Sequence, residues 1–360
     1  MEINDFTFLV TDDCNFRCSY CPQSKENTYL NDAIADKAVD FFAPFFAHPC
    51  YINFYEGEPL LGFDRIQHVV ECLSRIERRS NNKFLYTITT NGSLIDDEVL
   101  RFFGQNKFSL VMSFDGLAQD ISRQKGSFDR IVPVIKKLLS SPNIQIVVNS
   151  VFTPDTVDFL SKSVQFVMEM AVPNIDFTVS GILPWDELSI LKLSRELVQL
   201  RKFTLKFFEE TGTIPVEIFR ERIRKGSYCC KAGLNRMALA PDGKLWGCPA
   251  FHNYFHERES SQEYLKYSFG DLEYFIDNHR TIYPKILKNY SCLRQESYFT
   301  AQISCASCSE LEECDACPIY SAFSTSCIGE IAEWICKIKK IFRQERASFR
   351  ADLNVLDDGL

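Results

Sequence analysis

Hydrophobic and polar positions in the first half of the chain follow two alternating patterns. Some stretches carry apolar residues at helical spacing; in residues 64–79, for example, Ile66, Val70 and Leu73 lie on one face. The predicted helices are 32–46, 64–79, 96–103, 128–139 and 155–170. Short runs rich in apolar, β-branched and aromatic residues predict strands at 6–11, 52–55, 84–89, 110–114, 144–148 and 175–179.

Alternating strands and helices predict parallel strands joined by right-handed crossovers. Six such units predict an α/β fold built on an open, partial (β/α)6 TIM barrel. In such barrels the active site lies in the loops that follow the C-terminal ends of the strands. These loops hold polar and glycine-rich residues at 12–21, 56–59, 90–93, 115–116 and 149–150.

The pattern changes beyond residue 180. Residues 184–228 predict a bridging, mostly helical region, and from residue 229 cysteines, aromatics and turns dominate. This composition predicts a smaller, irregular α+β cysteine-rich domain. We therefore expect a barrel over 1–183, a bridge over 184–228, a second domain over 229–347 that ends in a helix at 330–347, and a tail over 348–360.

The composition is that of a globular protein, with 46% hydrophobic and 24% charged residues. The net charge of −8 argues against nucleic acid or an anionic membrane as the main partner. No apolar run reaches the length of about 18 residues that a membrane-spanning helix needs, and residues 1–12 lack the features of a secretion signal. These observations predict a cytoplasmic protein.

The 15 cysteines are unevenly placed along the chain. Three lie within residues 14–21, ten lie between Cys229 and Cys336, and only Cys50 and Cys72 lie between the two groups. In a reducing compartment disulfides are rare, so clustered thiols are expected to bind metal or to react.

The first group has three residues between Cys14 and Cys18 and two between Cys18 and Cys21. Thiolates are the usual ligands of a four-iron cluster, and a full site takes four of them. Three ligands leave one iron open to a small molecule. The alternative is a zinc knuckle, which would need a fourth ligand, and no histidine lies nearby in the sequence.

This spacing resembles the signature of the radical S-adenosylmethionine (SAM) superfamily. The resemblance implies that the methionine amine and carboxylate of SAM bind the open iron. An electron from the cluster would then cleave a carbon–sulfur bond of SAM and produce a 5′-deoxyadenosyl radical, while the protein supplies position and shielding.

Further residues match motifs of the same family across nearly the whole chain. The resemblance implies that Tyr20 packs on adenine, that Gly57 and Glu58 hold the methionine ammonium, and that Arg123 pairs with the SAM carboxylate. Asn91 matches a Thr-Asn-Gly motif, and Ser113 and Asp115 match a Ser-x-Asp-Gly motif that faces methionine or ribose.

Two features of these matches leave questions open. Glu56 replaces the first glycine of the family's Gly-Gly-Glu-Pro motif, which leaves the backbone shape at that position undetermined. Taken alone, Asn91-Gly92 is an ordinary turn and Arg123 a surface charge. The case for a SAM site depends on the joint order of these residues.

The second cysteine group resembles the SPASM domain, a C-terminal extension of radical SAM enzymes that modify peptides and proteins. This domain normally carries two auxiliary four-iron clusters. The resemblance implies a nearer cluster on Cys230, Cys248 and Cys317, whose fourth ligand is Cys229, Cys292 or an open position. It implies a farther cluster held by Cys305, Cys308, Cys314 and Cys336. We favour Cys336 over Cys327. The spacing alone also allows a pair of zinc ribbons.

The resemblance to radical SAM enzymes with a SPASM domain implies three [4Fe–4S] clusters, SAM, a peptide or protein substrate, and an electron donor such as flavodoxin or ferredoxin. The expected step is oxidation of a peptide after hydrogen abstraction, giving a thioether, C–C or C–O crosslink. The auxiliary clusters would accept the second electron. The first strand begins so close to the start that no separate peptide-recognition domain is expected before Cys14, so a precursor leader would dock elsewhere or be presented by a separate protein. The aromatic-rich segment 251–299 is a candidate docking surface; alternatively, these aromatics form core.

Two other functions compete with this prediction. Sulfatase maturases share the architecture, but an aspartate that serves as their base follows the cysteine matching Cys248, and here Pro249 follows it. No other base stands out among Asp242, Glu257 and Tyr254, so the catalytic residue is undetermined. A zinc-binding interaction protein would explain the cysteines but not the ordered motifs in the barrel loops.

Overall fold

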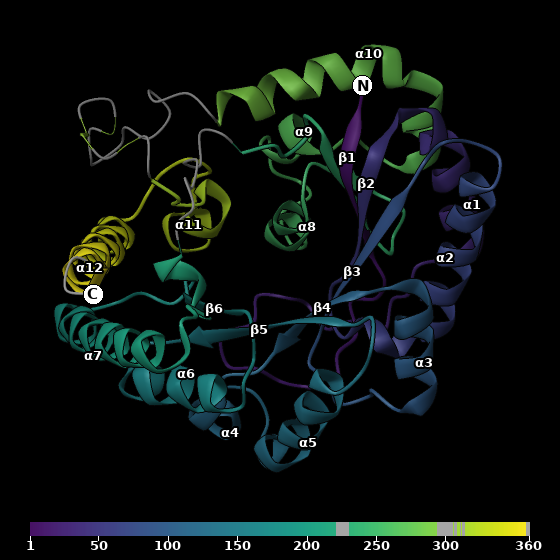
Figure 1. Cartoon of the computed structure of the whole chain (residues 1–360). Helices are drawn as coiled ribbons and strands as arrows, with labels where there is room; N and C mark the ends of the chain where they lie inside the picture. Colours follow the sequence, from purple (N-terminus) through teal and green to yellow (C-terminus); the bar gives the residue numbers. More distant parts are fainter. Residues whose placement is uncertain (221–229, 294–304, 306–307, 310, 312–313, 358–360) are drawn as a thin grey trace.

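The computed structural model describes residues 1–220, 230–293, 305, 308–309, 311 and 314–357. Its centre is one sheet with the strand order β6-β5-β4-β3-β2-β1-β7-β8, in which β1 to β7 pair in parallel and β8 is antiparallel to β7 (Figure 1). The strands are β1 (Ile3–Leu9), β2 (Phe46–Tyr55), β3 (Phe84–Thr90), β4 (Ser109–Ser113), β5 (Gln145–Phe152), β6 (Ile175–Val179), β7 (Arg236–Leu239) and β8 (Leu245–Trp246). The predicted partial barrel is confirmed.

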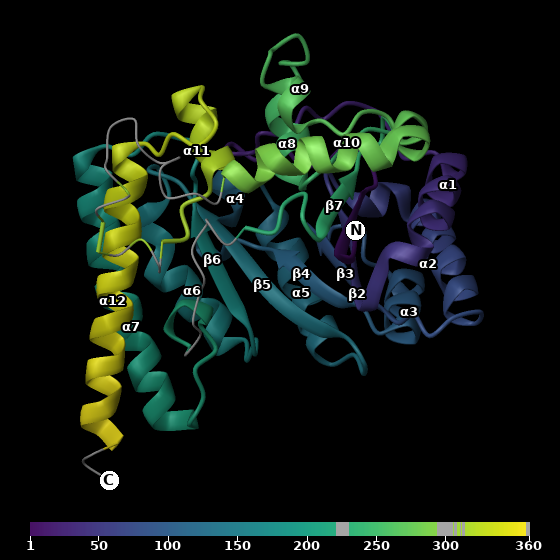
Figure 2. The ribbon, with the colours of Figure 1, turned by 90° about the horizontal axis from the view of Figure 1, so that it is seen from above.

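Helices cover the outer face of this curved sheet, and the C-terminal helices lie at its edges and across one end (Figures 1 and 2). The barrel helices are α1 (Asp32–Phe42), α2 (Phe63–Glu77), α3 (Asp97–Asn106), α4 (Gln119–Ser122), α5 (Ser127–Leu139), α6 (Leu160–Glu169) and α7 (Glu187–Thr211). The later helices are α8 (Pro249–Phe255), α9 (Tyr264–Tyr267), α10 (Leu272–Cys292), α11 (Pro318–Thr325) and α12 (Glu333–Asp357). In the part of the chain that the structure describes, none of these helices is long and apolar enough to cross a membrane.

Stacked and tilted phenylalanines fill the space between the sheet and the helices. The rings of Phe6 and Phe42 lie 5.0 Å apart, and Phe54 stacks on Phe108 at 5.9 Å. All four side chains are at most 1% exposed. Such burial contributes roughly 1.5–3 kcal/mol per side chain and fixes the strand ends from which the polar loops extend.

β7 was not among the predicted strands, although it joins the sheet beside β1. The carboxylate of Asp5 in β1 accepts a hydrogen bond from Arg236 in β7 at 2.9 Å and another from Asn53 in β2 at 2.8 Å. Because these polar residues interrupt the apolar runs, the hydrophobic pattern predicted the start of β1 too late and did not predict β7. The predicted boundary between residues 228 and 229 lies outside the described residues.

The last helix differs from its predicted span of 330–347. It begins at Glu333 and continues to Asp357, through most of the expected tail. The physical reason is burial beyond residue 347: Phe349 is fully buried and stacks on Phe219 at 4.5 Å. Arg201 of α7 also contacts the carboxylates of Glu345 and Asp352, which ties α12 along α7 (Figure 2).

Candidate active site

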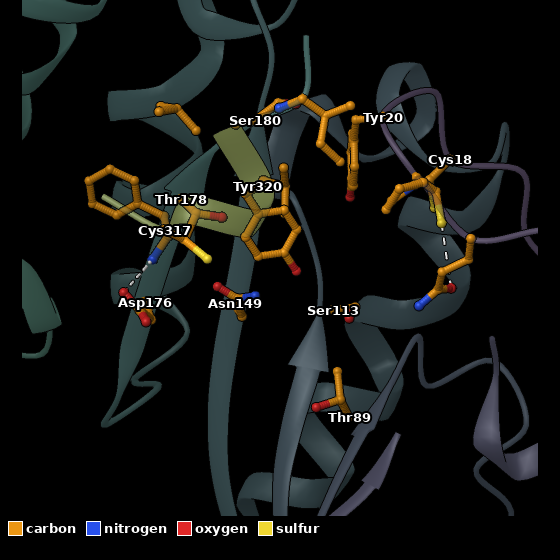
Figure 3. Close-up of a pocket in the computed structure, with 18 of the residues that line it drawn as sticks. Cys18, Tyr20, Thr89, Ser113, Asn149, Asp176, Thr178, Ser180, Cys317 and Tyr320 are labelled. Carbon is orange, nitrogen blue, oxygen red and sulfur yellow. Dashed lines mark hydrogen bonds between the residues drawn. The ribbon is translucent and has the colours of Figure 1, made fainter. Parts of the chain in front are cut away.

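A cavity of about 590 Å³ opens at the C-terminal ends of the barrel strands. Its wall combines the loops after β1, β2 and β3, the ends of β4 to β6, and side chains of α8, α11 and α12. Figure 3 shows polar side chains of β3 to β6 facing this space, with Tyr320 of α11 pointing in from the opposite side. Of the positions expected to form the site, those within 12–21, 56–59, 90–93 and 149–150 contribute to this one cavity, whereas Asp115 and Gly116 do not line it.

Cys14, Cys18 and Cys21 all line this cavity, on the loop after β1. Burial raises the pKa of Cys14 to about 11 and also raises the pKa values of the other two thiols. Free thiols in this position would be protonated, so thiolates here require a compensating positive charge. A bound metal supplies such a charge, and three thiols on one cavity wall are a suitable donor set for an iron–sulfur cluster.

Gly57 allows the loop after β2 to pack against this cysteine loop. Its φ is +53°, and a Cβ atom at this position would lie 2.0 Å from the carbonyl oxygen of Asp13. The next amide, that of Glu58, donates to the same oxygen at 2.8 Å. Only glycine fits this contact, because both the backbone conformation and the close approach exclude a side chain.

The carboxylate of Glu58 is fully buried and is not part of the cavity wall. It accepts hydrogen bonds from the Thr90 hydroxyl at 2.6 Å and from the Asn91 and Leu60 amides at 2.7 and 3.2 Å. Burial raises its pKa to about 7 despite these hydrogen bonds. In this structure Glu58 therefore connects the loops after β2 and β3, while Asn91 itself lines the cavity.

Asp115 organises the loop after β4 in a similar way. It is fully buried and accepts hydrogen bonds from Tyr20 at 3.0 Å, Ser122 at 2.6 Å, Arg123 at 2.9 Å and the Val151 amide at 2.8 Å. Tyr20 and Arg123 line the cavity, but Asp115 does not. Its carboxylate thus fixes the directions of one aromatic ring and one guanidinium.

Arg123 retains an unused hydrogen-bond donor beside the cavity. Its guanidinium lies over the ring of Tyr20, 5.5 Å from the centroid, and its Nε has no hydrogen-bond partner in the described part of the chain. A buried donor without a partner is costly. A carboxylate in the cavity would satisfy it, since arginine suits such groups.

Glu56 resolves the question that the sequence left at this position. Its φ is +81°, so a non-glycine residue adopts the left-handed conformation that glycine favours. The side chain is 1% exposed and lines the cavity, and Asn253 of α8 donates to its Oε2 at 3.2 Å. Burial and the nearby Asp12 raise its pKa to about 7, against the opposing effects of His252 and Asn253.

Other cavity residues were not predicted as site residues. They include Tyr55, Asp176, Thr178, Asn253 and Tyr320. Asp176 and Thr178 alternate with buried residues along β6, so a period-two reading of that strand could have marked them. Asn253 and Tyr320 lie a few residues after Cys248 and Cys317. No spacing rule predicted which of the residues after each cysteine would face the barrel.

The second cysteine group forms two sets in space. Burial, followed by the charges of Cys230 and Cys317, raises the pKa of Cys248 to about 12, which places these three thiols within electrostatic range of one another. Cys317 lines the cavity. Cys292 ends α10 and Cys229 lies outside the described residues, so the fourth ligand stays a prediction.

Cys305, Cys308, Cys314 and Cys336 make up the other set. Burial, followed by the charges of Cys314, Cys336 and Cys308, raises the pKa of Cys305 to about 11. Cys327 instead is exposed, and the charges that act on it come from Glu263, Glu330 and Lys266. The structure thus brings Cys336, and not Cys327, to the other three thiols.

The aromatic-rich segment 251–299 is mainly core where the structure describes it. The rings of Phe251 and Tyr290 lie 4.8 Å apart, and those of Trp246 and Phe255 stack at 5.6 Å. All four side chains are at most 2% exposed, whereas Tyr274 is 57% exposed. The alternative that these aromatics form core is therefore confirmed for most of those that the structure describes, and they do not form a docking surface.

Residues 8–165 match the family model of the radical SAM superfamily. This chain carries a radical SAM domain. The matched residues include the cysteine loop after β1 and the loops after β2, β3 and β4, which are the loops that form the cavity. A radical SAM domain implies that SAM and a [4Fe–4S] cluster bind here, and the thiol set, the Gly57 contact and the unpaired Arg123 Nε fit both groups.

Relatives of this chain include named maturases. It is 24% identical over 326 residues to the radical SAM cyclopropyl synthase TigE of Paramaledivibacter caminithermalis, covering 81% of this chain and 68% of that protein. It is 26% identical over 172 residues to the cysteine-type anaerobic sulfatase-maturating enzyme of Clostridium novyi, covering 44% of this chain and 46% of that enzyme.

Among solved structures, the fold resembles native anSMEcpe with bound AdoMet. The TM-score is 0.76 at 18% identity, over 99% of this chain and 100% of that one. A further structure of anSMEcpe, with bound AdoMet and the Cp18Cys peptide, matches with a TM-score of 0.73, again at 18% identity and over 99% and 100% of the two chains. At this identity the likeness shows the fold, which extends over the cysteine-rich C-terminal region as well as the barrel.

Proposed function

We propose that this chain is a peptide maturase that abstracts a hydrogen atom from a ribosomally made peptide and installs an oxidative modification, a thioether, C–C or C–O crosslink. Reductive cleavage of SAM at a [4Fe–4S] cluster would supply the 5′-deoxyadenosyl radical, with flavodoxin or ferredoxin as electron donor. Cys14, Cys18 and Cys21 would hold that cluster. Auxiliary clusters would be held by Cys230, Cys248 and Cys317 and by Cys305, Cys308, Cys314 and Cys336.

The observation that carries this proposal is that one cavity touches both cysteine groups. Cys14, Cys18 and Cys21 lie on its wall, and so does Cys317. A substrate in this cavity would have a radical source on one side and an electron acceptor on the other. Two-electron oxidation of a carbon centre needs both a radical source and an electron acceptor, whereas a rearrangement needs only the radical source.

The side chains around the cavity suggest how SAM would be oriented. The hydroxyl of Tyr20 is held by Asp115, which leaves its ring facing the cavity for adenine. Arg123 offers its Nε to the SAM carboxylate, and Asn91 and Ser113 offer polar groups from β3 and β4. Glu58 would act on the methionine ammonium through the loop geometry that it fixes.

The likeness to named maturases supports a peptide or protein substrate. The TigE name includes formation of a cyclopropyl ring, which is carbon–carbon bond formation, and anSMEcpe binds a peptide in one of its structures. Sulfatase maturation is the second candidate because of the Clostridium novyi relative. Pro249 occupies the position after Cys248, so the aspartate expected of those enzymes is missing here.

Anaerobic reconstitution tests the proposal. Purified chain should contain iron and acid-labile sulfide, and should form 5′-deoxyadenosine from SAM when dithionite is added. Co-expression with a short peptide encoded next to its gene should lower the peptide mass by two hydrogen atoms. Zinc without sulfide would instead support the zinc-binding alternative, and oxidation of a sulfatase peptide alone would support sulfatase maturation.

A further inference from the structure

Oxidative maturation leaves a proton to be removed, and Pro249 cannot accept it. Among the described residues, three carboxylates line the cavity: Glu56, Asp176 and Asp315. Asp315 is paired with Lys339 at 2.9 Å, and Asp176 takes part in other interactions at the β6 edge. Glu56 differs from both because it is buried, at 1% exposure, whereas Asp176 and Asp315 are only half-buried. Its one described hydrogen bond comes from the neutral amide of Asn253.

The backbone at Glu56 is strained where a glycine would not be. A left-handed conformation is unfavourable for a non-glycine residue, and φ is +81° here. Such outliers persist when the surroundings hold them in place, and they concentrate at functional sites. The strain therefore needs a compensating role for the side chain, which glycine could not provide.

The side chain of Glu56 lies where the two halves of the cavity meet. It follows β2 directly, and Asn253, its hydrogen-bond donor, lies on α8, which begins one residue after Cys248. The carboxylate is 1% exposed and on the cavity wall, so it exchanges protons with the cavity and not with bulk water. The titratable groups around it are Asp12, Cys21, Tyr55, His252 and Tyr320.

We infer that Glu56 is the catalytic base of the maturation reaction. This inference rests on the proposed function. After the 5′-deoxyadenosyl radical has taken a hydrogen atom from the peptide, the substrate radical gives one electron to an oxidised auxiliary [4Fe–4S] cluster and one proton to the Glu56 carboxylate. The peptide then loses two hydrogen atoms in total, SAM becomes methionine and 5′-deoxyadenosine, and the cluster is reduced by one electron.

The electrostatics of the site suit this role. A base works best when its pKa lies near the working pH, and burial raises that of Glu56 to about 7. His252, whose Nε2 lies 3.0 Å from Oδ1 of Asp12, limits this rise in the pKa of Glu56. A glutamate on the protein surface has a lower pKa, so it would be a weaker base and would release the proton more readily.

Two substitutions separate the role of the carboxylate from that of the fold. Glu56→Gln keeps the shape without the base, and Glu56→Gly restores the residue that relieves the strained backbone. Both should still form 5′-deoxyadenosine with SAM, dithionite and the peptide, while the rate of crosslinked product falls by at least about 100-fold. Glu71→Gln is the control, since Glu71 is exposed on α2 and lies outside the cavity wall, and it should behave as wild type.

Freeze-quench EPR gives a readout other than turnover. In Glu56→Gln the substrate radical cannot lose its proton, so a carbon-centred signal should accumulate, and peptide recovered from D₂O should contain deuterium from quenched radical. Wild-type product rates in Glu56→Gln, with no such signal, would overturn the base assignment but leave the maturase proposal standing. Wild-type chain that makes 5′-deoxyadenosine but modifies no peptide would overturn the maturase proposal, and the base assignment with it.

An infrared measurement tests the carboxyl group without any substrate. The difference between wild type and Glu56→Gln should show a protonated carboxyl band that disappears between about pH 6 and about pH 8. A carboxylate that stays ionised throughout this range would contradict the assignment.

Discussion

The imidazole Nε2 of His252 lies 3.0 Å from Oδ1 of Asp12, although 240 residues separate them in the sequence. Both side chains are buried, at 6% and 4% exposure. Asp12 lies on the loop after β1, two residues before Cys14, and His252 lies on α8 just after Cys248. This one contact therefore connects the two regions that carry the two cysteine groups.

We expect His252→Ala to destabilise the chain by about 3–5 kcal/mol, because removing one partner leaves the Asp12 carboxylate buried without its partner. Urea unfolding of the cluster-containing protein measures this change. His256→Ala is the matched control, since His256 pairs with the exposed Glu26 and should change stability by less than about 1 kcal/mol. Equal losses in the two variants would contradict the role of the buried pair.

Glu56 is expected to make stability depend on pH. Burial raises its pKa from 4.5 to about 7, so the folded chain holds this proton more tightly than the unfolded chain. Its contribution to the free energy of unfolding is thus complete below about pH 4.5 and is lost as the pH rises to about 7, a change of about 3 kcal/mol. Glu56→Gln should match wild type near pH 4.5 and exceed its stability at pH 8. A difference between them that does not change with pH would refute this.

Gly57→Ala should prevent the cysteine loop from packing, because the added Cβ would lie 2.0 Å from the Asp13 oxygen. We expect loss of iron at the first cluster and weaker SAM binding, measured by iron analysis and equilibrium dialysis. Gly126→Ala is the control, since φ is +76° there but no atom lies within 4 Å of the added Cβ. It should lower stability by about 1 kcal/mol and leave iron content unchanged.

Cys336→Ser and Cys327→Ser should differ in iron content. Cys336 lies within electrostatic range of Cys305, and Cys327 does not belong to this set. Loss of a ligand should release the iron of one [4Fe–4S] cluster from Cys336→Ser, while Cys327→Ser retains it. Iron counting with Mössbauer spectra checks this, and the reverse result would assign the ligand to Cys327.

The barrel was predictable because apolar residues recur at different intervals in its strands and in its helices. β7 was not, because Arg236 interrupts its apolar run and pairs with Asp5, a partner that no local window contains. The length of α12 was underestimated for a related reason. Its last turns are held by Phe219 and Arg201, which lie far away in the sequence.

The candidate site was predictable as a set of residues but not as an arrangement. Motif matching marked Glu58 and Asp115 together with the residues that face the cavity, whereas the structure places both carboxylates behind its wall. Glu56 was noted only as a departure from a motif. Its importance depends on Asn253, which donates a hydrogen bond to it from α8. No local sequence pattern can predict this contact, because the two residues lie far apart in the sequence.

If Cys336 binds a metal group, the course of α12 would link the assembly of that group to substrate selection. Cys336 lies in the first turn of this helix, and Ile338 and Phe342, further along the same helix, form part of the cavity wall. A rigid helix transmits a displacement at one end to side chains along its length. A metal group that binds Cys336 would therefore set the pocket's shape from a distance, so that an incompletely assembled protein would bind its substrate poorly before any electron moved.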